Sequence, residues 1–143
     1  MEGITMSTGM CFGRFDIVHK GHLNWFSWCR SHVDKLYIGV ASNDYCQQRN
    51  LSVVNSCEER IAVVRALWFG DEVFEYNSHD PFELWKRHGR TDYIFLNSEL
   101  KLSCEYREPL NNLYAKKVRI LWPPRTPGVS VSRIKERIRN ERN

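Results

Sequence analysis

Residues 13–22 constrain this sequence more than any other stretch, because they join a predicted strand to a predicted helix. They read Gly-Arg-Phe-Asp-Ile-Val-His-Lys-Gly-His. Mostly apolar residues precede them, and the aromatic and apolar residues that follow are frequent enough to cover one broad helix face. A turn from strand to helix leaves the first helical N–H groups unpaired at the positive end of the helix dipole. The stretch therefore predicts an anion-binding site.

Two glycines and two histidines in this stretch favour phosphate as the anion. Gly13 and Gly21 lack a Cβ, so the backbone can approach a phosphate closely. His19 and His22 are three residues apart, and their rings share a face if both lie on the first helical turn. Imidazoles placed in this way can donate hydrogen bonds to phosphate oxygens and stabilise the charge that builds up during phosphoryl displacement. This chemistry is electrostatic and needs no covalent intermediate.

Other interpretations of the same residues are a polar surface, a zinc site and a nucleophile pair. Zinc requires three or four ligands, and the sequence contains neither a His-Glu-x-x-His nor a Cys-x-x-Cys motif, so no metal ligand is expected. Cys11 could pair with His19 as a nucleophile, but it stands within an apolar strand, where a cysteine behaves as a core residue.

The composition indicates one globular domain, residues 1–143, with 42% hydrophobic residues. No window approaches the ~18 apolar residues of a membrane span, and the start lacks a signal pattern, so we expect a cytoplasmic protein without membrane contact. The five cysteines are odd in number and scattered, which predicts reduced thiols. The net charge of +4 lies partly on the last helix, where a solvated face explains it better than a nucleic-acid partner.

Along the chain, predicted strands alternate with predicted helices. After the first strand, further strands are expected at 35–42, 72–76, 92–97 and 118–122. A first helix is expected after residue 19, and a second begins at a Ser56 cap and carries the apolar stripe Ile61, Val64, Leu67 and Trp68. A third helix is expected from an Asp80 cap to 88–89. A fourth is expected over part of 103–117, where Pro109 limits the helix. Residues 43–56 are predicted to form a mobile loop. The alternation predicts an α/β fold, about five parallel strands with helices on both faces, and ligands at the carboxyl ends of the strands.

A second strand, glycine-containing loop and helix start follow at residues 118–134. Arg125 can make a bidentate contact with phosphate oxygens. Thr126, Ser130 and Ser132, with free N–H groups, can complete a phosphate cradle. Serine is also a common helix cap, so the hydroxyls alone do not separate a cradle from a cap.

Residues 13–22 resemble the signature of the nucleotidyltransferase superfamily that contains the cytidylyltransferases, Gly-x-Phe-Asp-x-x-His-x-Gly-His, and match it at every fixed position. Residues 125–132 resemble the second signature of that family, with Val131 where a hydroxyl residue is usual. Residues 58–60, Glu-Glu-Arg, resemble a third segment whose arginine points to the nucleotide; the other interpretation of Arg60 is a surface arginine. The resemblance spans nearly the whole chain. It implies a Rossmann-like three-layer sandwich and commonly a homodimer.

The resemblance also implies roles for individual residues. The candidate catalytic residues are His19, His22 and Arg125. The candidate nucleotide-binding residues are Gly13, Arg14, Phe15, Asp16, His19, Gly21, His22, Arg60, Arg125, Thr126, Gly128, Val129, Ser130 and Ser132. Mg²⁺ is expected to be bound through the nucleotide phosphates.

The implied reaction joins CTP to a small phosphomonoester, a phosphorylated alcohol, polyol or amino-alcohol, and releases pyrophosphate. Members acting on glycerol 3-phosphate usually carry acceptor-site lysines that this chain lacks, which leaves Lys20, Arg49 and His79 as the candidate acceptor-binding residues. Two alternatives stay open. ATP is the first, because Gly-Arg-Phe at 13–15 is related to adenylyl-transferring members and residues 96–99 depart from the usual Gly-Asp-Asp. The second is a non-catalytic nucleotide-binding regulatory module, which the retention of both histidines opposes.

Overall fold

The structure is a computed structural model that describes residues 6–97, 103–124 and 138–140. Its centre is a five-stranded sheet with the strand order β3-β2-β1-β4-β5, and each neighbouring pair is parallel. The strands are β1 (Thr8–Gly13), β2 (Lys35–Ala41), β3 (Glu72–Tyr76), β4 (Tyr93–Phe95) and β5 (Arg119–Leu121). The predicted set of five parallel strands is therefore confirmed.

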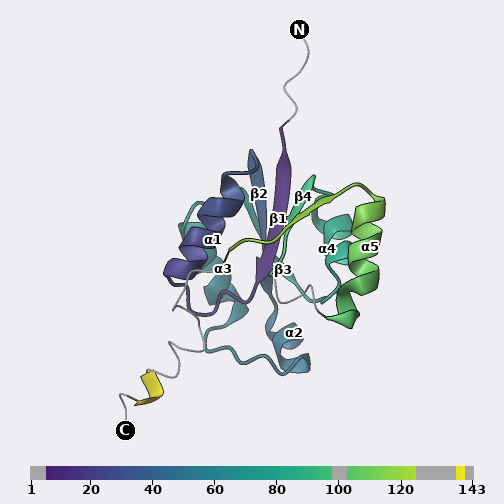
Figure 1. The fold of residues 1–143 in the computed structure, drawn as a ribbon. Helices are drawn as coiled ribbons and strands as arrows, with labels where there is room; N and C mark the ends of the chain where they lie inside the picture. The colour runs from purple at the N-terminus through teal and green to yellow at the C-terminus, as the bar shows by residue number, and fades with distance from the viewer. Residues whose placement is uncertain (1–5, 98–102, 125–137, 141–143) are drawn as a thin grey trace.

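Helices cover both faces of this sheet, as the alternation of elements predicted. In Figure 1, α1 and α3 lie on one side, α4 and α5 lie on the other, and α2 lies below the carboxyl ends of the strands. The helices are α1 (Lys20–Arg30), α2 (Asn43–Gln48), α3 (Cys57–Ala66), α4 (Pro81–His88), α5 (Arg107–Ala115) and a 3₁₀ turn, η2 (Cys104–Tyr106). The fold is a Rossmann-like three-layer α/β sandwich.

Each face of the sheet buries its own apolar cluster. Phe26 and Cys29 of α1 and Val64 of α3 pack with strand residues such as Ile38 on one face. Trp85 of α4 and Leu113 of α5 pack with Met10 and Ile94 on the other. The strands alternate between these two clusters and are buried on both faces, which is the usual setting of a parallel sheet.

The helix starts follow the predicted caps. The Ser56 hydroxyl accepts a hydrogen bond from the Glu59 N–H at 3.2 Å. The Asp80 carboxylate accepts from the N–H groups of Phe82 and Glu83, and Pro81 is the first residue of α4. Pro109 is accommodated in the first turn of α5, where its missing N–H costs nothing.

Two predictions about local structure are wrong. Residues 43–56 are not a continuous loop, because they contain α2. Ser42 caps that helix by accepting from the Tyr45 N–H at 3.0 Å, and Tyr45 and Cys46 are buried. Trp68 does not belong to the apolar stripe of α3: it follows the helix end with a φ of 60° and is 89% exposed.

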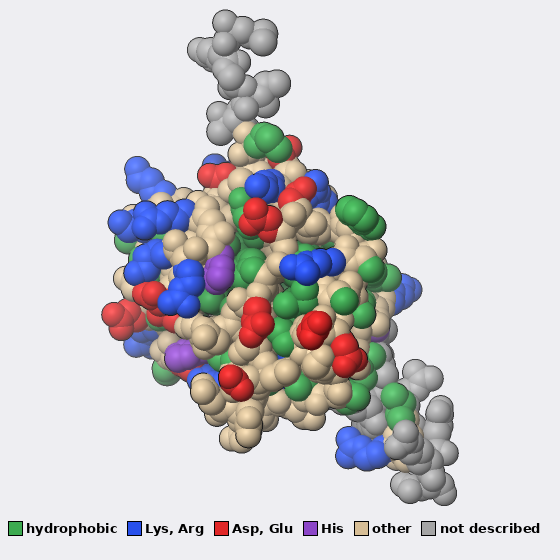
Figure 2. All heavy atoms as spheres, turned by 180° about the vertical axis from the view of Figure 1, so that it is seen from behind, with side chains coloured by type: hydrophobic (Ala, Val, Ile, Leu, Met, Phe, Trp, Pro, Cys, Tyr) green, Lys and Arg blue, Asp and Glu red, His purple; other side chains and the backbone are tan. Residues whose placement is uncertain are grey.

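Charges of both signs cover the surface. Figure 2 shows basic side chains gathered on the side of α4 and α5, with acidic side chains among them and across the rest of that face. The last turn of α4 contributes Lys86 and Arg87. The face seen in Figure 2 thus carries no continuous basic stripe.

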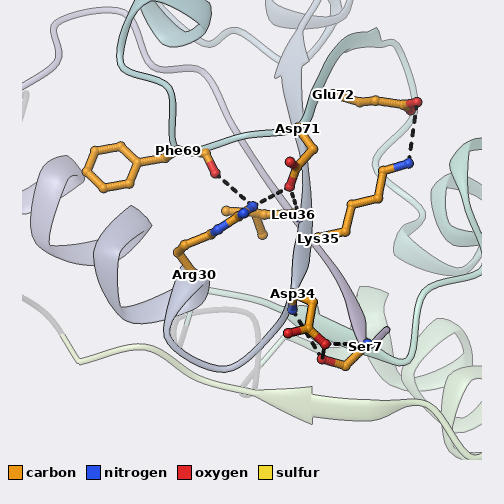
Figure 3. A network of polar contacts seen from close by, with 8 residues as sticks. All are labelled: Ser7, Arg30, Asp34, Lys35, Leu36, Phe69, Asp71 and Glu72. Carbon is orange, nitrogen blue, oxygen red and sulfur yellow. Dashed lines mark hydrogen bonds and ion pairs between the residues drawn. The ribbon is translucent and has the colours of Figure 1, made fainter. Parts of the chain in front are cut away.

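Polar contacts fasten the amino ends of the three strands on one side of the sheet (Figure 3). Arg30, at the end of α1, pairs with Asp71, which precedes β3. Asp71 also accepts from the Leu36 N–H of β2 at 2.8 Å. Asp34, before β2, accepts from the N–H of Ser7, before β1, at 2.9 Å. These contacts lie at the amino ends of the strands, and the loops that lead into the helices leave from the carboxyl ends.

We predict that Asp71→Ala lowers the free energy of unfolding at pH 7 by about 1–2 kcal/mol, because it removes a charge-assisted hydrogen bond and an ion pair together. Burial raises the pKa of Asp71, but the Leu36 N–H and the Arg30 charge outweigh burial and leave the pKa lowered. The stabilisation is therefore present at neutral pH and is lost as the pH falls through the lowered pKa. Urea unfolding at pH 7 and near pH 3 measures this change.

Glu72→Ala is the matched control, because the Glu72 carboxylate is more exposed and lies 4.0 Å from the Lys35 ammonium. It should change the free energy of unfolding by less than about 0.5 kcal/mol. Equal effects of the two substitutions would contradict the role of Asp71.

Candidate active site

The connection from β1 to α1 contains the predicted phosphate-binding stretch and is held in one conformation. Phe15 has a φ of 50°, which is costly for a bulky residue. Its ring is 3% exposed and lies 4.9 Å from the Phe26 ring in the core beneath α1. A Cβ on Gly13 would meet the Phe15 ring at 2.8 Å, so the turn requires glycine there. Core packing of Phe15 thus sets the path of the backbone that precedes the histidines.

His19 and His22 form a capping box at the start of α1. His19 is the N-cap residue, and its Nδ1 accepts from the Gly21 N–H at 3.0 Å. The Nδ1 of His22 accepts from the His19 N–H at 3.1 Å. The ring centroids lie 4.0 Å apart. The prediction that the two rings share one face is confirmed.

These hydrogen bonds set the tautomer of both rings. Because each Nδ1 is an acceptor, we assign the proton of each neutral ring to Nε2. Burial lowers the pKa of His22 to about 4, with a further lowering by His19, and burial also lowers the pKa of His19. At neutral pH the helix start therefore offers two uncharged Nε2–H donors. Within the described part of the chain, neither Nε2 has a hydrogen-bond partner.

Asp16 holds this loop to the segment before α3. Its carboxylate accepts from the N–H groups of Val54 at 2.8 Å and Asn55 at 2.9 Å. The Asn55 amide donates to the Asp16 carbonyl at 2.8 Å, and Asp16 is 5% exposed. These contacts give Asp16 a structural part in the site, and its predicted contact with a nucleotide stays a prediction.

Arg60 is buried, with 1% of its surface exposed, so the interpretation as a surface arginine is wrong. Its guanidinium donates to the carbonyl of Asn55 at 3.1 Å, the carbonyl of Arg14 at 2.8 Å and the side-chain oxygen of Asn43 at 2.9 Å. It therefore joins the β1–α1 loop, the start of α2 and the segment before α3. Its predicted contact with the nucleotide stays a prediction, because these contacts are all to protein.

Two of the three predicted acceptor-binding residues lie together. Arg49 pairs with both carboxylate oxygens of Glu105, at 2.7 and 3.1 Å, and the His79 Nε2 lies 3.4 Å from the same carboxylate. Lys20 is exposed at the first position of α1. Sequence reasoning missed Glu105, which lies 56 residues from Arg49 and has no local pattern that marks it.

The remaining predicted residues divide into two groups. Arg14, on the β1–α1 loop, donates to the Ser52 carbonyl at 3.2 Å and so joins that loop to the segment after α2. The whole second cradle falls outside the described residues: Arg125, Thr126, Gly128, Val129, Ser130 and Ser132.

The described residues favour no metal or thiol chemistry of their own. In 6–97, 103–124 and 138–140 no three His, Cys, Asp or Glu residues are grouped as metal ligands would be. Burial and the neighbouring Cys29 raise the pKa of Cys11, which opposes a thiolate nucleophile. All five cysteines are free, as predicted. Over the same ranges no helix has the length and apolar character needed to cross a bilayer.

The chain matches a known protein family over most of its length, including the β1–α1 loop. The family model described as cytidylyltransferase-like matches residues 10–137. The chain belongs to this family. Its relatives are nucleotidyltransferases, and it is a nucleotidyltransferase too.

The cytidylyltransferase-like chain is 23% identical over 133 residues to the glycerol-3-phosphate cytidylyltransferase of Bacillus subtilis, covering 93% of this chain and 98% of that protein. It is 29% identical over 103 residues to the FAD synthase of Methanosarcina barkeri, covering 72% and 73%. A lipopolysaccharide core biosynthesis protein of Thermoplasma volcanium has the same fold, with a TM-score of 0.73 at 22% identity over 85% of this chain and 99% of that one.

We predict that the His22 ring of this nucleotidyltransferase titrates near pH 4, well below an ordinary histidine. The unfolded chain takes up that proton near pH 6.5 and the folded chain does not, so stability falls as the pH drops from about 6.5 toward 4. Histidine ring signals in NMR, followed from pH 8 to pH 3.5, measure the titration. A His22 midpoint above pH 6 would contradict the assigned geometry.

We also predict that Arg60→Met lowers the free energy of unfolding by about 2–4 kcal/mol, because it removes a buried guanidinium that donates to three part-buried oxygen atoms. Arg65→Met on the exposed face of the same helix is the control, and should change it by less than about 0.5 kcal/mol. Chemical unfolding of both variants without nucleotide makes the comparison. Similar stability of the two variants would contradict the bracing role of Arg60.

Proposed function

We propose that this nucleotidyltransferase transfers CMP from CTP to a small phosphomonoester and releases pyrophosphate. The observation that carries the proposal is the pair of Nε2–H donors at the start of α1, fixed by hydrogen bonds to both Nδ1 atoms. Donors held in this way cost little reorganisation when charge develops on a phosphate beside them.

In the proposed reaction an oxygen of the acceptor phosphate attacks the α-phosphorus of the nucleotide in line. The new P–O bond forms as the bond to the bridging oxygen breaks, and the electron pair leaves with pyrophosphate. His19 and His22 donate to the oxygens of the α-phosphate, and the positive end of the α1 helix dipole adds to the field there. Both rings keep their protons throughout. Arg125 and the hydroxyls of Ser130 and Ser132 remain the predicted contacts of the β- and γ-phosphates.

The donor set of the loop fits an anion rather than a bare cation. The Asp16 carboxylate is engaged by backbone N–H groups, and both imidazoles present N–H. Mg²⁺ would therefore be held by the nucleotide phosphates, whose charge it neutralises. A homodimer, a cytoplasmic location and the absence of a nucleic-acid partner stay predictions from the sequence.

CTP is supported by the nearly full-length match to the glycerol-3-phosphate cytidylyltransferase. ATP is the second candidate donor, because several FAD synthases also match, including that of Thermococcus onnurineus at 28% identity over 131 residues. FAD contains an AMP half, so such a relative points to adenylyl transfer. Arg14, in the Gly-Arg-Phe sequence, favours the same alternative.

Pyrophosphate release tests the proposal, with each of CTP, ATP, GTP and UTP in the presence of Mg²⁺ and a panel of phosphorylated alcohols, polyols, amino-alcohols and FMN. We predict that His19→Asn and His22→Gln each lower kcat by about 10²–10³-fold. Asparagine can still cap the helix, and glutamine at the third helical position can still reach the N-cap N–H, so each variant removes the imidazole while keeping the local fold.

His32→Asn is the matched control, because His32 is exposed beyond the end of α1. It should retain wild-type kcat. Release with ATP alone would move the proposal to adenylyl transfer. Nucleotide-specific thermal stabilisation without pyrophosphate release from any acceptor would favour the regulatory module instead.

A further inference from the structure

A charged cluster bridges the two sides of the proposed active site. Arg49 closes α2, which follows β2, and Glu105 lies in η2, between β4 and α5. Because β2 and β4 flank β1 in the sheet, the ion pair joins the segments on either side of the β1 end. His79, from the connection after β3, contacts the same carboxylate. Figure 1 shows α2 below the carboxyl ends of the strands, at the end where the β1–α1 loop begins.

The cluster is accessible to a ligand. The side chains of Arg49, Glu105 and His79 are 36%, 37% and 45% exposed. The helix that positions Arg49 is packed on the core, because Tyr45 of α2 is buried and its ring lies 5.5 Å from the ring of the equally buried Tyr76. The segment that follows α2 is joined to the phosphate-binding loop through the Arg14 contact with the Ser52 carbonyl. The cluster therefore has a defined position relative to that loop.

Glu105 changes what this cluster can recognise. Two of the five guanidinium N–H donors of Arg49 are committed to the carboxylate, and the charges of the pair cancel. The hydrogen bond from Arg49 holds the pKa of Glu105 below its ordinary value, so the carboxylate is anionic at neutral pH. An acceptor that enters here meets a guanidinium that can donate hydrogen bonds to its phosphate and, directly beside it, a carboxylate that accepts hydrogen bonds and repels a further anionic group.

We propose that Glu105 is a specificity residue of the acceptor subsite, which selects phosphomonoesters whose second group is a hydroxyl or an ammonium and rejects those whose second group is anionic. This inference rests on the proposed nucleotidyl transfer, and it narrows the acceptor to polyol and amino-alcohol phosphates. Repulsion of the wrong ligand supplies part of the selectivity, as it does in many specific sites.

Glycerol 3-phosphate and 3-phosphoglycerate test the proposal, because they differ by a hydroxymethyl group against a carboxylate. The measurement is kcat/KM for each acceptor with the preferred nucleotide, in the wild type, in Glu105→Gln and in Glu108→Gln. Glutamine keeps the size of Glu105 and one of its two acceptor oxygens but removes its charge. Glu108 is exposed in the first turn of α5 and serves as the matched control.

The wild type should prefer glycerol 3-phosphate, and Glu105→Gln should reduce that preference roughly tenfold by improving use of 3-phosphoglycerate. Glu108→Gln should leave the preference unchanged. A merely structural role for Glu105 would lower both kcat/KM values together and leave their ratio intact. An unchanged ratio in Glu105→Gln would overturn the proposal.

Thermal stabilisation by each acceptor, measured with nucleotide present, separates this proposal from the proposed function. If no acceptor yields pyrophosphate but Glu105→Gln still increases stabilisation by 3-phosphoglycerate relative to glycerol 3-phosphate, the transfer reaction fails and the charge selection stands. If neither acceptor reacts or stabilises the wild type, both fail.

Discussion

The geometry of the candidate site depends on the hydrogen bonds that the buried guanidinium of Arg60 donates. The guanidinium joins three segments that are distant in sequence: the β1–α1 loop, the first turn of α2 and the segment before α3. Asp16 makes a second connection between the first and third of these, through the backbone of Val54 and Asn55. The loop proposed to bind the nucleotide phosphates is thus held by contacts within the protein itself. Such preorganisation lowers the cost of stabilising charge during the reaction.

The capping box at the start of α1 both stabilises the helix and positions the two imidazole rings. The same hydrogen bonds that satisfy the Gly21 and His19 N–H groups also hold the two rings, whose planes are inclined by 31°, and leave both Nε2 atoms as the donors. Neutral rings suit this role, because they donate hydrogen bonds without requiring a proton to move. Burial lowers the pKa of His22 far enough that this neutral form is kept across the physiological range.

Two candidate sites with different electrostatic character lie side by side at the carboxyl ends of the strands. Over β1, neutral donors and a helix start face the place proposed for the nucleotide phosphates. Beside it, the pair of Arg49 and Glu105 is charged but balanced. The opposite edge carries contacts such as that between Asp34 and Ser7, which hold the strands and face no candidate ligand site. The proposed recognition therefore lies at one end of the strands, and these strand-holding contacts lie at the other.

The sequence alone was enough to determine the parallel α/β fold, the helix caps at Ser56 and Asp80, and the closeness of His19 and His22. These features depend on local patterns: apolar runs, cap residues and a spacing of three on one helical turn. Helix α2 was missed because a six-residue helix shows no clear period, and the burial of Tyr45 against Tyr76 stabilises it from another part of the chain.

Only the tertiary structure decided that Arg60 is buried and that Glu105 meets Arg49 and His79. These contacts join residues 46 and 56 positions apart, across loops whose paths depend on how the helices pack on the sheet. Local sequence can specify which side chains a helix or strand presents to one another. It cannot specify which distant carboxylate will neutralise an arginine, because that depends on the packing of the whole chain.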